Sequence, residues 1–201
     1  MYNLDEGKKL VSIARKNIES YLVTRKNISI QDVPESFKVH CGVFVTLHTY
    51  PKNSLRGCIG YPEPVLPLID AVLDASVSSA TRDPRFQKVR PDELKNLVVE
   101  ITVLTPPELV KVENTGQYPS KIEVGRDGLI VELGFRKGLL LPQVPVEENW
   151  DAEDFLCHTC QKAGLPLDCW MDKNTKIYKF QGQIFSETKP EGEVVEKSFM
   201  R

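Results

Sequence analysis

The stretch SLRGCIGYPEPV, residues 54–65, combines an arginine, a cysteine and two glycines in a segment that otherwise has the pattern of a buried strand. Alternate residues of a strand point to one face, so Arg56 and Cys58 would project together, with their Cα atoms roughly 6.5–7 Å apart. A guanidinium beside a thiol lowers the thiol pKa and favours the thiolate, the nucleophilic form of cysteine. The pattern therefore indicates a reactive thiol at Cys58, with Arg56 as its activating cation.

A candidate base lies on the strand before this stretch. The turn sequence YPKNS joins CGVFVTLHT, residues 41–49, to LRGCIG and predicts a hairpin. If His48 pairs with Arg56, then Thr46 faces Cys58, and His48 lies diagonally from the thiol. His48, Cys58 and Arg56 then form a base, a nucleophile and an anion holder on one surface. A one-residue change of register breaks this arrangement, and a small buried cysteine beside a bulge explains the same residues without any chemistry.

Four further residues are candidates for ligand binding. Gly57 and Gly60 suit a place where a ligand or another segment of the chain comes close to the backbone. Asp83 and Arg85 follow a predicted helix, where they either hold a polar ligand or belong to a solvated loop. Glu100 interrupts the apolar run LVVEITVLT and would need a partner if it were buried, so we interpret it as structural.

The run Cys157-His158-Thr159-Cys160 contains residue types that bind zinc. With about 100° between successive residues of a helix, Cys157 and Cys160 lie about 60° apart, while His158 points away from them. A zinc site needs four converging ligands, and no second CxxC or HxxxH motif supplies them. Neither GRDG nor GFRKG precedes a helix, as a phosphate-binding loop would. We therefore expect no metal site and no cofactor.

The spacing of apolar residues predicts the elements that would position these side chains. Helical periodicity predicts helices over 4–24, over 66–82 and within ENWDAEDFLCHTCQKAGLP, residues 148–166. Apolar alternation or continuous apolar runs predict strands over 41–49, 55–60, 97–105 and 176–185, with short strands at IEV, LIVEL and LLL. Because helices and strands interleave but hairpins dominate, we predict an α+β fold on a largely antiparallel sheet with packed helices. A polar tail is expected from Ser186 onward.

Composition and charge argue against several classes of protein. The 201 residues include 26 Lys and Arg against 28 Asp and Glu, a net charge of −2, and the cations are scattered along the chain. Bulk nucleic-acid binding needs a basic stripe and is not expected. No apolar run approaches the ~20 residues of a membrane helix, and the N-terminus lacks the apolar core of a signal peptide. With five cysteines in all, the chain is expected to be cytoplasmic, without membrane binding and with free thiols.

Several motifs occur in the order typical of one protein family. They are CGVFVTL at 41–47, LRGCIG at 55–60, DPRF at 83–86, EITVLTPP at 100–107, GRDGLIVELG at 125–134, LPQV at 141–144 and KAGLP at 162–166. On these motifs the chain resembles the AMMECR domain family over nearly its whole length, as a single domain of residues 1–201, and LRGCIG is the hallmark of that family. The resemblance implies two subdomains, a larger one from about 1–105 and 146–201 and a smaller one of about 106–145.

The resemblance also implies a biological context. Family members occur alone or fused to Memo-type proteins, and alongside radical SAM proteins, which implies a shared pathway that modifies a small molecule, RNA or another biomolecule. We expect Memo-type and radical SAM proteins as partners. In one hypothesis the protein is an enzyme or catalytic accessory that uses Cys58 in a cleft. In the other it is a non-catalytic adaptor or regulatory protein that docks a partner through the LRGCIG surface. A thiol of low pKa in a polar cleft favours the first, and a flat apolar patch favours the second.

Overall fold

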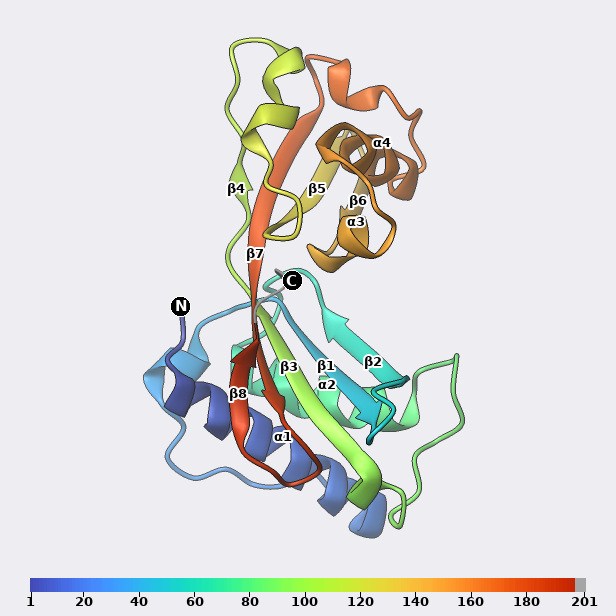
Figure 1. Cartoon of the computed structure of the whole chain (residues 1–201). Helices are drawn as coiled ribbons and strands as arrows, with labels where there is room; N and C mark the ends of the chain where they lie inside the picture. The colour runs from blue at the N-terminus through green and yellow to red at the C-terminus, as the bar shows by residue number, and fades with distance from the viewer. Residues whose placement is uncertain (198–201) are drawn as a thin grey trace. The chain divides into compact units, whose positions relative to one another are not determined.

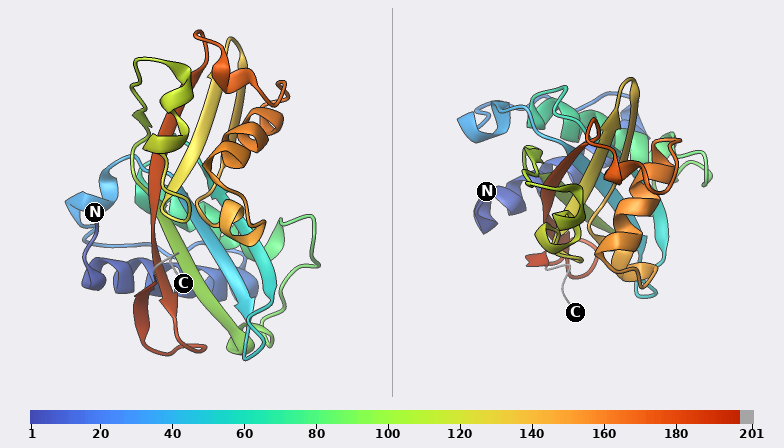
Figure 2. Two further views of the ribbon diagram at one scale, coloured as in Figure 1. Left: turned by 45° about the horizontal axis from the view of Figure 1, so that its top comes forward. Right: turned by 90° about the horizontal axis from the view of Figure 1, so that it is seen from above.

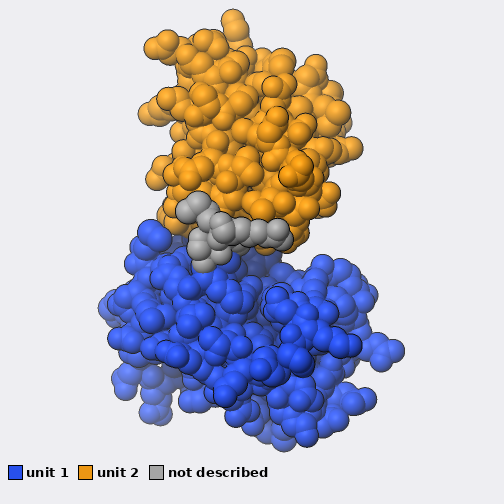
Figure 3. All heavy atoms as spheres, in the orientation of Figure 1, with its two compact units in different colours: residues 1–104, 183–197 blue, residues 105–182, 198–201 orange. Residues whose placement is uncertain are grey.

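The computed structural model describes residues 1–197, and these divide into two compact units (Figure 3). Unit 1 consists of residues 1–104 and 183–197, and unit 2 of residues 105–182. The fold is α+β, with helices packed on antiparallel strands, which confirms the predicted class. Over residues 1–197 no helix is both long and apolar enough to cross a lipid bilayer.

The elements of unit 1 are shown in Figure 1. In chain order they are α1 (Leu4–Thr24), η1 (Glu35–Lys38), β1 (Val43–Thr49), β2 (Leu55–Tyr61), α2 (Leu68–Thr81), η2 (Leu94–Asn96), β3 (Leu97–Leu104), the C-terminal part of β7 (Lys176–Glu187) and β8 (Val194–Lys197). Strand β2 is the edge strand, followed by β1, β3 and β7, and β8 pairs with β7. The predicted helices at 4–24 and 66–82 and the strands at 41–49, 55–60 and 97–105 are confirmed, with small shifts at their ends.

Helices α1 and α2 cover one face of the strands of unit 1 (Figures 1 and 2). Val43, Val45 and Leu47 alternate along β1 and join both helices in one apolar core. The start of α1 is fixed by a capping box, in which Asn3 Oδ1 accepts from the Glu6 N–H and the Glu6 carboxylate accepts from the Asn3 N–H, each at 2.9 Å. The opposite residues of β1 therefore point to the face of the sheet that these two helices do not cover.

The hairpin of β1 and β2 has a bulge that the sequence does not reveal. Thr46 pairs with Cys58, as predicted, and Leu47 pairs with Gly57. The next residue, His48, pairs with Leu55, so the prediction that His48 lies opposite Arg56 is wrong. The extra residue on β2 is Arg56, which the bulge removes from the regular alternation of side chains.

The elements of unit 2 come mainly from the middle of the chain. They are β4 (Glu108–Leu109), η3 (Thr115–Gln117), η4 (Pro119–Lys121), β5 (Asp127–Leu133), β6 (Arg136–Leu140), α3 (Gln143–Glu147), α4 (Ala152–Lys162), η5 (Cys169–Met171) and the N-terminal part of β7. Strand β5 lies between β6 and β7, and β4 pairs with β7. Helix α4 packs on β5 and β6 with Phe155 and Leu156 in the core. Residues 146–182 therefore belong to unit 2, whereas the sequence grouped them with the larger subdomain.

Three local expectations are wrong. The segment IEV is not a strand, since β5 begins only at Asp127. A polar tail was expected from Ser186, but β7 continues to Glu187, and the chain then returns as β8, which pairs with β7. Buried Glu187 fixes this end of β7 by accepting hydrogen bonds from the Arg15 guanidinium and from the Val99 N–H. The expectation of free thiols fails for one pair, because a disulfide joins Cys160 to Cys169.

Candidate functional site

A row of polar side chains crosses three strands of unit 1. Thr46 on β1 pairs with Cys58 on β2 and with Glu100 on β3, so the three side chains share one face of the sheet. This is the face opposite to Val45 and Leu47, which lie in the core under α1 and α2. The Thr46 hydroxyl donates a hydrogen bond to Cys58 Sγ at 3.3 Å. The row places a half-buried thiol beside a hydroxyl donor and a carboxylate.

Asp83 and Arg85 hold the backbone of Cys58 from the outer side of the edge strand. The Cys58 N–H donates to Asp83 Oδ2 at 2.9 Å, and Arg85 Nη2 donates to the Cys58 carbonyl at 3.3 Å. Asp83 is only 4% exposed and also accepts from Arg85 Nε at 3.0 Å and from Arg85 Nη2 at 2.7 Å. Hydrogen bonds from the Arg85 side chain hold the pKa of Asp83 well below its usual range, despite the burial that would raise it. The two loop residues therefore satisfy the backbone groups that an edge strand leaves unpaired.

The surroundings of Cys58 favour the neutral form of its thiol. Burial raises the pKa of the Cys58 thiol above its usual value. The hydrogen bond from Thr46 and the positive charge of Arg85 act in the opposite direction but do not outweigh burial. The sequence led us to expect a thiol of low pKa activated by Arg56, and the structure differs on both points. The cation that acts on the sulfur is Arg85, and the pKa is raised rather than lowered.

His48 lies on the same face of β1 as Thr46 and contacts the Glu100 carboxylate. His48 Nε2 is 3.7 Å from Glu100 Oε1, and Lys197 Nζ donates to Glu100 Oε2 at 2.8 Å. Burial alone would raise the pKa of Glu100, but His48 and Lys197 lower it to about 2, so that Glu100 is an anion. The other ring nitrogen, His48 Nδ1, is buried and has no hydrogen-bond partner among the described residues. Glu100 therefore lies against one side of the imidazole, and the nitrogen on the other side is buried without a hydrogen-bond partner among the described residues.

Arg56 has partners of its own. Its Nε donates to Glu93 Oε1 at 2.6 Å, and its Nη2 donates to Glu93 Oε2 at 3.1 Å. The guanidinium carbon lies 5.9 Å from the centre of the Phe86 ring, and that of Arg85 lies 5.5 Å from the same ring. Both guanidinium groups thus contact the same aromatic ring, and each is paired with a carboxylate, Arg56 with Glu93 and Arg85 with Asp83.

The two glycines of the LRGCIG stretch, Gly57 and Gly60, lie against other segments of the chain. A Cβ atom at Gly57 would come within 2.1 Å of the backbone oxygen of Ser79 on α2. A Cβ atom at Gly60 would come within 2.2 Å of the Val43 oxygen and would meet Phe44 of β1. Of the two explanations that the sequence left open, close approach of the chain accounts for both residues.

The cysteines of α4 are arranged for structure rather than for metal binding. Cys160 is fully buried and bonded to Cys169. Trp170 Nε1 donates to Cys157 Sγ at 3.4 Å, and His158 stacks on Trp150 with 3.8 Å between ring centres. Within residues 1–197, no group of three or more His, Cys, Asp and Glu side chains is arranged to hold a metal ion.

Sequence reasoning missed two members of the site and considered a third only as a structural residue. Glu93 lies in an ordinary loop, and Lys197 lies in a segment that we expected to be a tail, so neither carries a local signal. Glu100 was interpreted as a structural residue, although a carboxylate inside an apolar strand was a usable indication of a buried polar network.

Fold and site together define an α+β protein with a thiol at an edge strand, held by a buried aspartate and an arginine. The chain belongs to the AMMECR1 family, whose sequence model matches residues 11–185. It is 54% identical over 200 residues to Protein MJ0810 of Methanocaldococcus jannaschii, with 100% of this chain and 99% of that protein aligned. The crystal structure of protein PH0010 from Pyrococcus horikoshii is similar to this chain, with a TM-score of 0.87, 52% identity and 98% of each chain covered. The family resemblance predicted from the motifs is thus confirmed.

Proposed function

We propose that this protein is an enzyme, or a catalytic accessory, that modifies a small molecule or an RNA nucleotide carrying an anionic group. Cys58 is the nucleophile in this proposal, His48 is the base, and Arg85 binds the anionic group. The observation that carries the proposal is the buried nitrogen of His48 that lacks a hydrogen-bond partner, on an imidazole that shares the sheet face of the thiol and lies against an ionised carboxylate. A base of this kind is what a nucleophilic cysteine needs when its own pKa is raised.

The proposed step begins with a neutral thiol. His48 Nδ1 takes the proton from Cys58 Sγ when substrate binds, and the Thr46 hydroxyl stabilises the thiolate through its hydrogen bond to sulfur. The sulfur forms a bond to the electrophilic atom of the substrate as the bond to the leaving group breaks. His48 then gives its proton to the leaving group, so charge and atoms balance. His48 lies diagonally from Cys58 across the two strands, so the two side chains are neighbours on one face of the sheet.

Arg85 is suited to bind an anion at this position. Its side chain is 54% exposed, while Asp83 holds it from behind through two of its nitrogens. The third nitrogen, Nη1, makes no hydrogen bond to any described residue and can reach a phosphate or carboxylate. The Arg85 guanidinium also lies over the Phe86 ring, 5.5 Å from its centre, which helps to fix its position. Memo-type and radical SAM proteins remain our proposed partners in the pathway.

The proposal is tested by the alkylation of cysteine in the native protein. Sub-stoichiometric iodoacetamide and mass-spectrometric peptide mapping should show that His48→Gln slows labelling of Cys58 about tenfold or more at pH 7. The difference in labelling rate between the wild type and His48→Gln should narrow at pH 9, where hydroxide removes the thiol proton without help from His48. Cys157 is the internal control, because it is also a half-buried free cysteine and should label at an unchanged rate.

A second experiment compares the molecules that co-purify with the wild-type protein and with Cys58→Ser. Metabolites or RNA fragments that co-purify with the wild type should be absent from the variant, while the circular dichroism spectrum stays the same. If His48→Gln labels like the wild type and Cys58→Ser retains every bound molecule, then Cys58 is a packing residue. In that case the adaptor hypothesis, in which the LRGCIG surface docks a partner, becomes the better explanation.

A further inference from the structure

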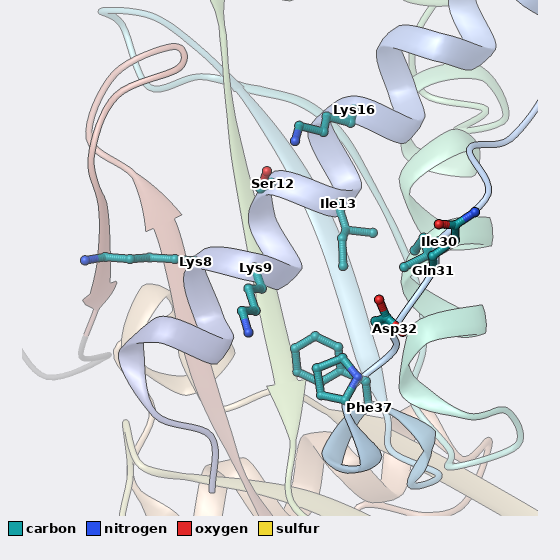
Figure 4. A pocket seen from close by; sticks show the side chains of 10 residues that line it. Lys8, Lys9, Ser12, Ile13, Lys16, Ile30, Gln31, Asp32 and Phe37 are labelled. Carbon is teal, nitrogen blue, oxygen red and sulfur yellow. The ribbon is translucent and has the colours of Figure 1, made fainter.

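We propose that a groove beside α1 binds an extended acidic segment of a partner protein that carries one bulky apolar side chain. The groove belongs to unit 1 and lies between α1 and the segment 30–37 (Figure 4). Its volume is about 430 Å³, which is within the range of specific ligand sites. This site is separate from Cys58 and from all the residues of the candidate functional site.

The floor of the groove is apolar. Ile13 of α1 and Ile30 of the facing segment are both half-buried, and Phe37 of η1 is fully buried below them. Figure 4 shows Ile13, Ile30 and Phe37 coming from the two sides of the groove. Because two of these three side chains keep part of their surface in water, an apolar group that covers them gains the free energy of burial. The floor therefore provides an anchor point for one leucine, isoleucine or phenylalanine.

The rim on the α1 side is positively charged. Lys8, Lys9 and Lys16 line the groove, and no described carboxylate forms an ion pair with any of them. Glu6, one turn before Lys9, is bound to the Asn3 N–H and to the Ser36 hydroxyl. Three lysines on the rim, against one aspartate on the opposite wall, favour an anionic occupant on the helix side.

The opposite wall restricts where an anion can bind. Asp32 lies there in a bend of the facing segment, and its side chain is exposed at the edge of the groove. A negative side chain of the partner is repelled from that wall and is therefore directed toward α1. The wall also offers Gln31, whose amide can hydrogen-bond to a peptide backbone.

The spacing along α1 defines the partner sequence. Lys9, Ile13 and Lys16 are at positions i, i+4 and i+7, on one face of the helix, and Lys9 and Lys16 are about 10 Å apart along its axis. In an extended peptide, residues on either side of an anchor at −2 and +2 point to the same side and lie roughly 13 Å apart. Lysine side chains are long enough to cover this difference. The expected motif is acid–x–apolar–x–acid, with the apolar side chain over Ile13.

The test uses three synthetic peptides in an NMR titration of the full-length protein. Acetyl-EALAE-amide is the probe, acetyl-QALAQ-amide lacks the charges, and acetyl-EASAE-amide lacks the anchor. We expect the probe to shift the amide signals of Ile13, Ile30 and Phe37. Each control peptide should bind at least about fivefold more weakly than the probe. The affinity of the probe should fall as salt is added. Equal binding by all three peptides, or no shift up to about 5 mM of the probe, would overturn the proposal.

A charge-reversal variant adds an independent arm. Lys16→Glu should weaken binding of the probe about fivefold or more, since it places a carboxylate beside the acidic residue of the peptide. Lys26→Glu is the matched control, because Lys26 is also exposed and lies outside the groove. Loss of binding in both variants alike, or in neither, contradicts the proposed contact. Cys58→Ser should bind the probe like the wild type, so this result is independent of the proposed chemistry.

Discussion

Replacing Asp83 by asparagine tests the central feature of the site, the buried carboxylate that holds Cys58 to Arg85. The carboxylate accepts hydrogen bonds from the Cys58 N–H, the Arg85 N–H and two nitrogens of the Arg85 side chain. Asparagine has the same shape but only one accepting oxygen, and its NH₂ group would face donors. At least one charge-assisted hydrogen bond is lost, and each such bond is worth about 1.5–3 kcal/mol.

The expected loss of stability in Asp83→Asn is smaller than the loss caused by breaking a fully buried ion pair. Removing one partner of such a pair costs about 3–5 kcal/mol, but Arg85 is half-exposed, so water solvates the guanidinium that Asp83→Asn leaves behind. We therefore expect the free energy of unfolding to fall by about 2–3 kcal/mol at pH 7. The matched control is Asp92→Asn, which should keep nearly all the stability of the wild type because both side chains of its pair with Arg90 are exposed.

The stability that the Asp83 carboxylate contributes should decrease as the pH is lowered. The pKa of Asp83 is lowered in the folded protein, so its contribution is fully present above the ordinary aspartate pKa of about 3.9 and is lost as the pH falls through the folded value. The difference in the free energy of unfolding between the wild type and Asp83→Asn should stay constant from pH 7 to about pH 5 and narrow below about pH 4.

Urea unfolding followed by far-UV circular dichroism is the appropriate measurement. Both tryptophans, Trp150 and Trp170, lie in unit 2, so their fluorescence does not report directly on unit 1. Hydrogen exchange of the Cys58 amide should also be faster in Asp83→Asn. The reasoning is refuted if Asp83→Asn loses no more stability than Asp92→Asn and the Cys58 amide exchanges as in the wild type.

Three further predictions concern stability. Gly57→Ala should lower the free energy of unfolding in urea by about 1–3 kcal/mol, because the new methyl group overlaps the backbone of Ser79. Gly116→Ala is the control and should be nearly neutral, because its Cβ meets only a side-chain atom at 3.3 Å. Cys169→Ser should lose roughly 2–3 kcal/mol, the value for a short disulfide loop, and non-reducing peptide mapping of the wild type should recover the linked pair. Glu100→Gln should flatten the fall of stability between about pH 4.3 and pH 2, because the low pKa of this carboxyl stabilises the fold above that window; an unchanged acid-unfolding curve would contradict it.

The main elements could be predicted because their signals are local. Helix α1 has an apolar stripe at helical spacing and a capping box at Asn3, and these features lie within a few residues of one another. Strand β3 is mostly apolar on both faces, and the turn before β2 separates two strand patterns. The pairing of Thr46 with Cys58 followed from the same hairpin. Short elements such as α3 (Gln143–Glu147) were missed because five residues carry too little periodicity to be recognised.

The sequence by itself determined the family, the fold class and the position of the hallmark motif on a hairpin, since motifs and periodicity are properties of neighbouring residues. Only the tertiary structure decided which side chains meet at Cys58. One bulged residue moved His48 out of register with Arg56, and the loop after α2 placed Arg85, rather than Arg56, against the backbone carbonyl of Cys58. Glu100 acquired its ionised state from His48 and from Lys197, a residue 97 positions away. Contacts of this kind depend on register and on the return of distant segments, and these are set by packing of the whole unit rather than by any local pattern.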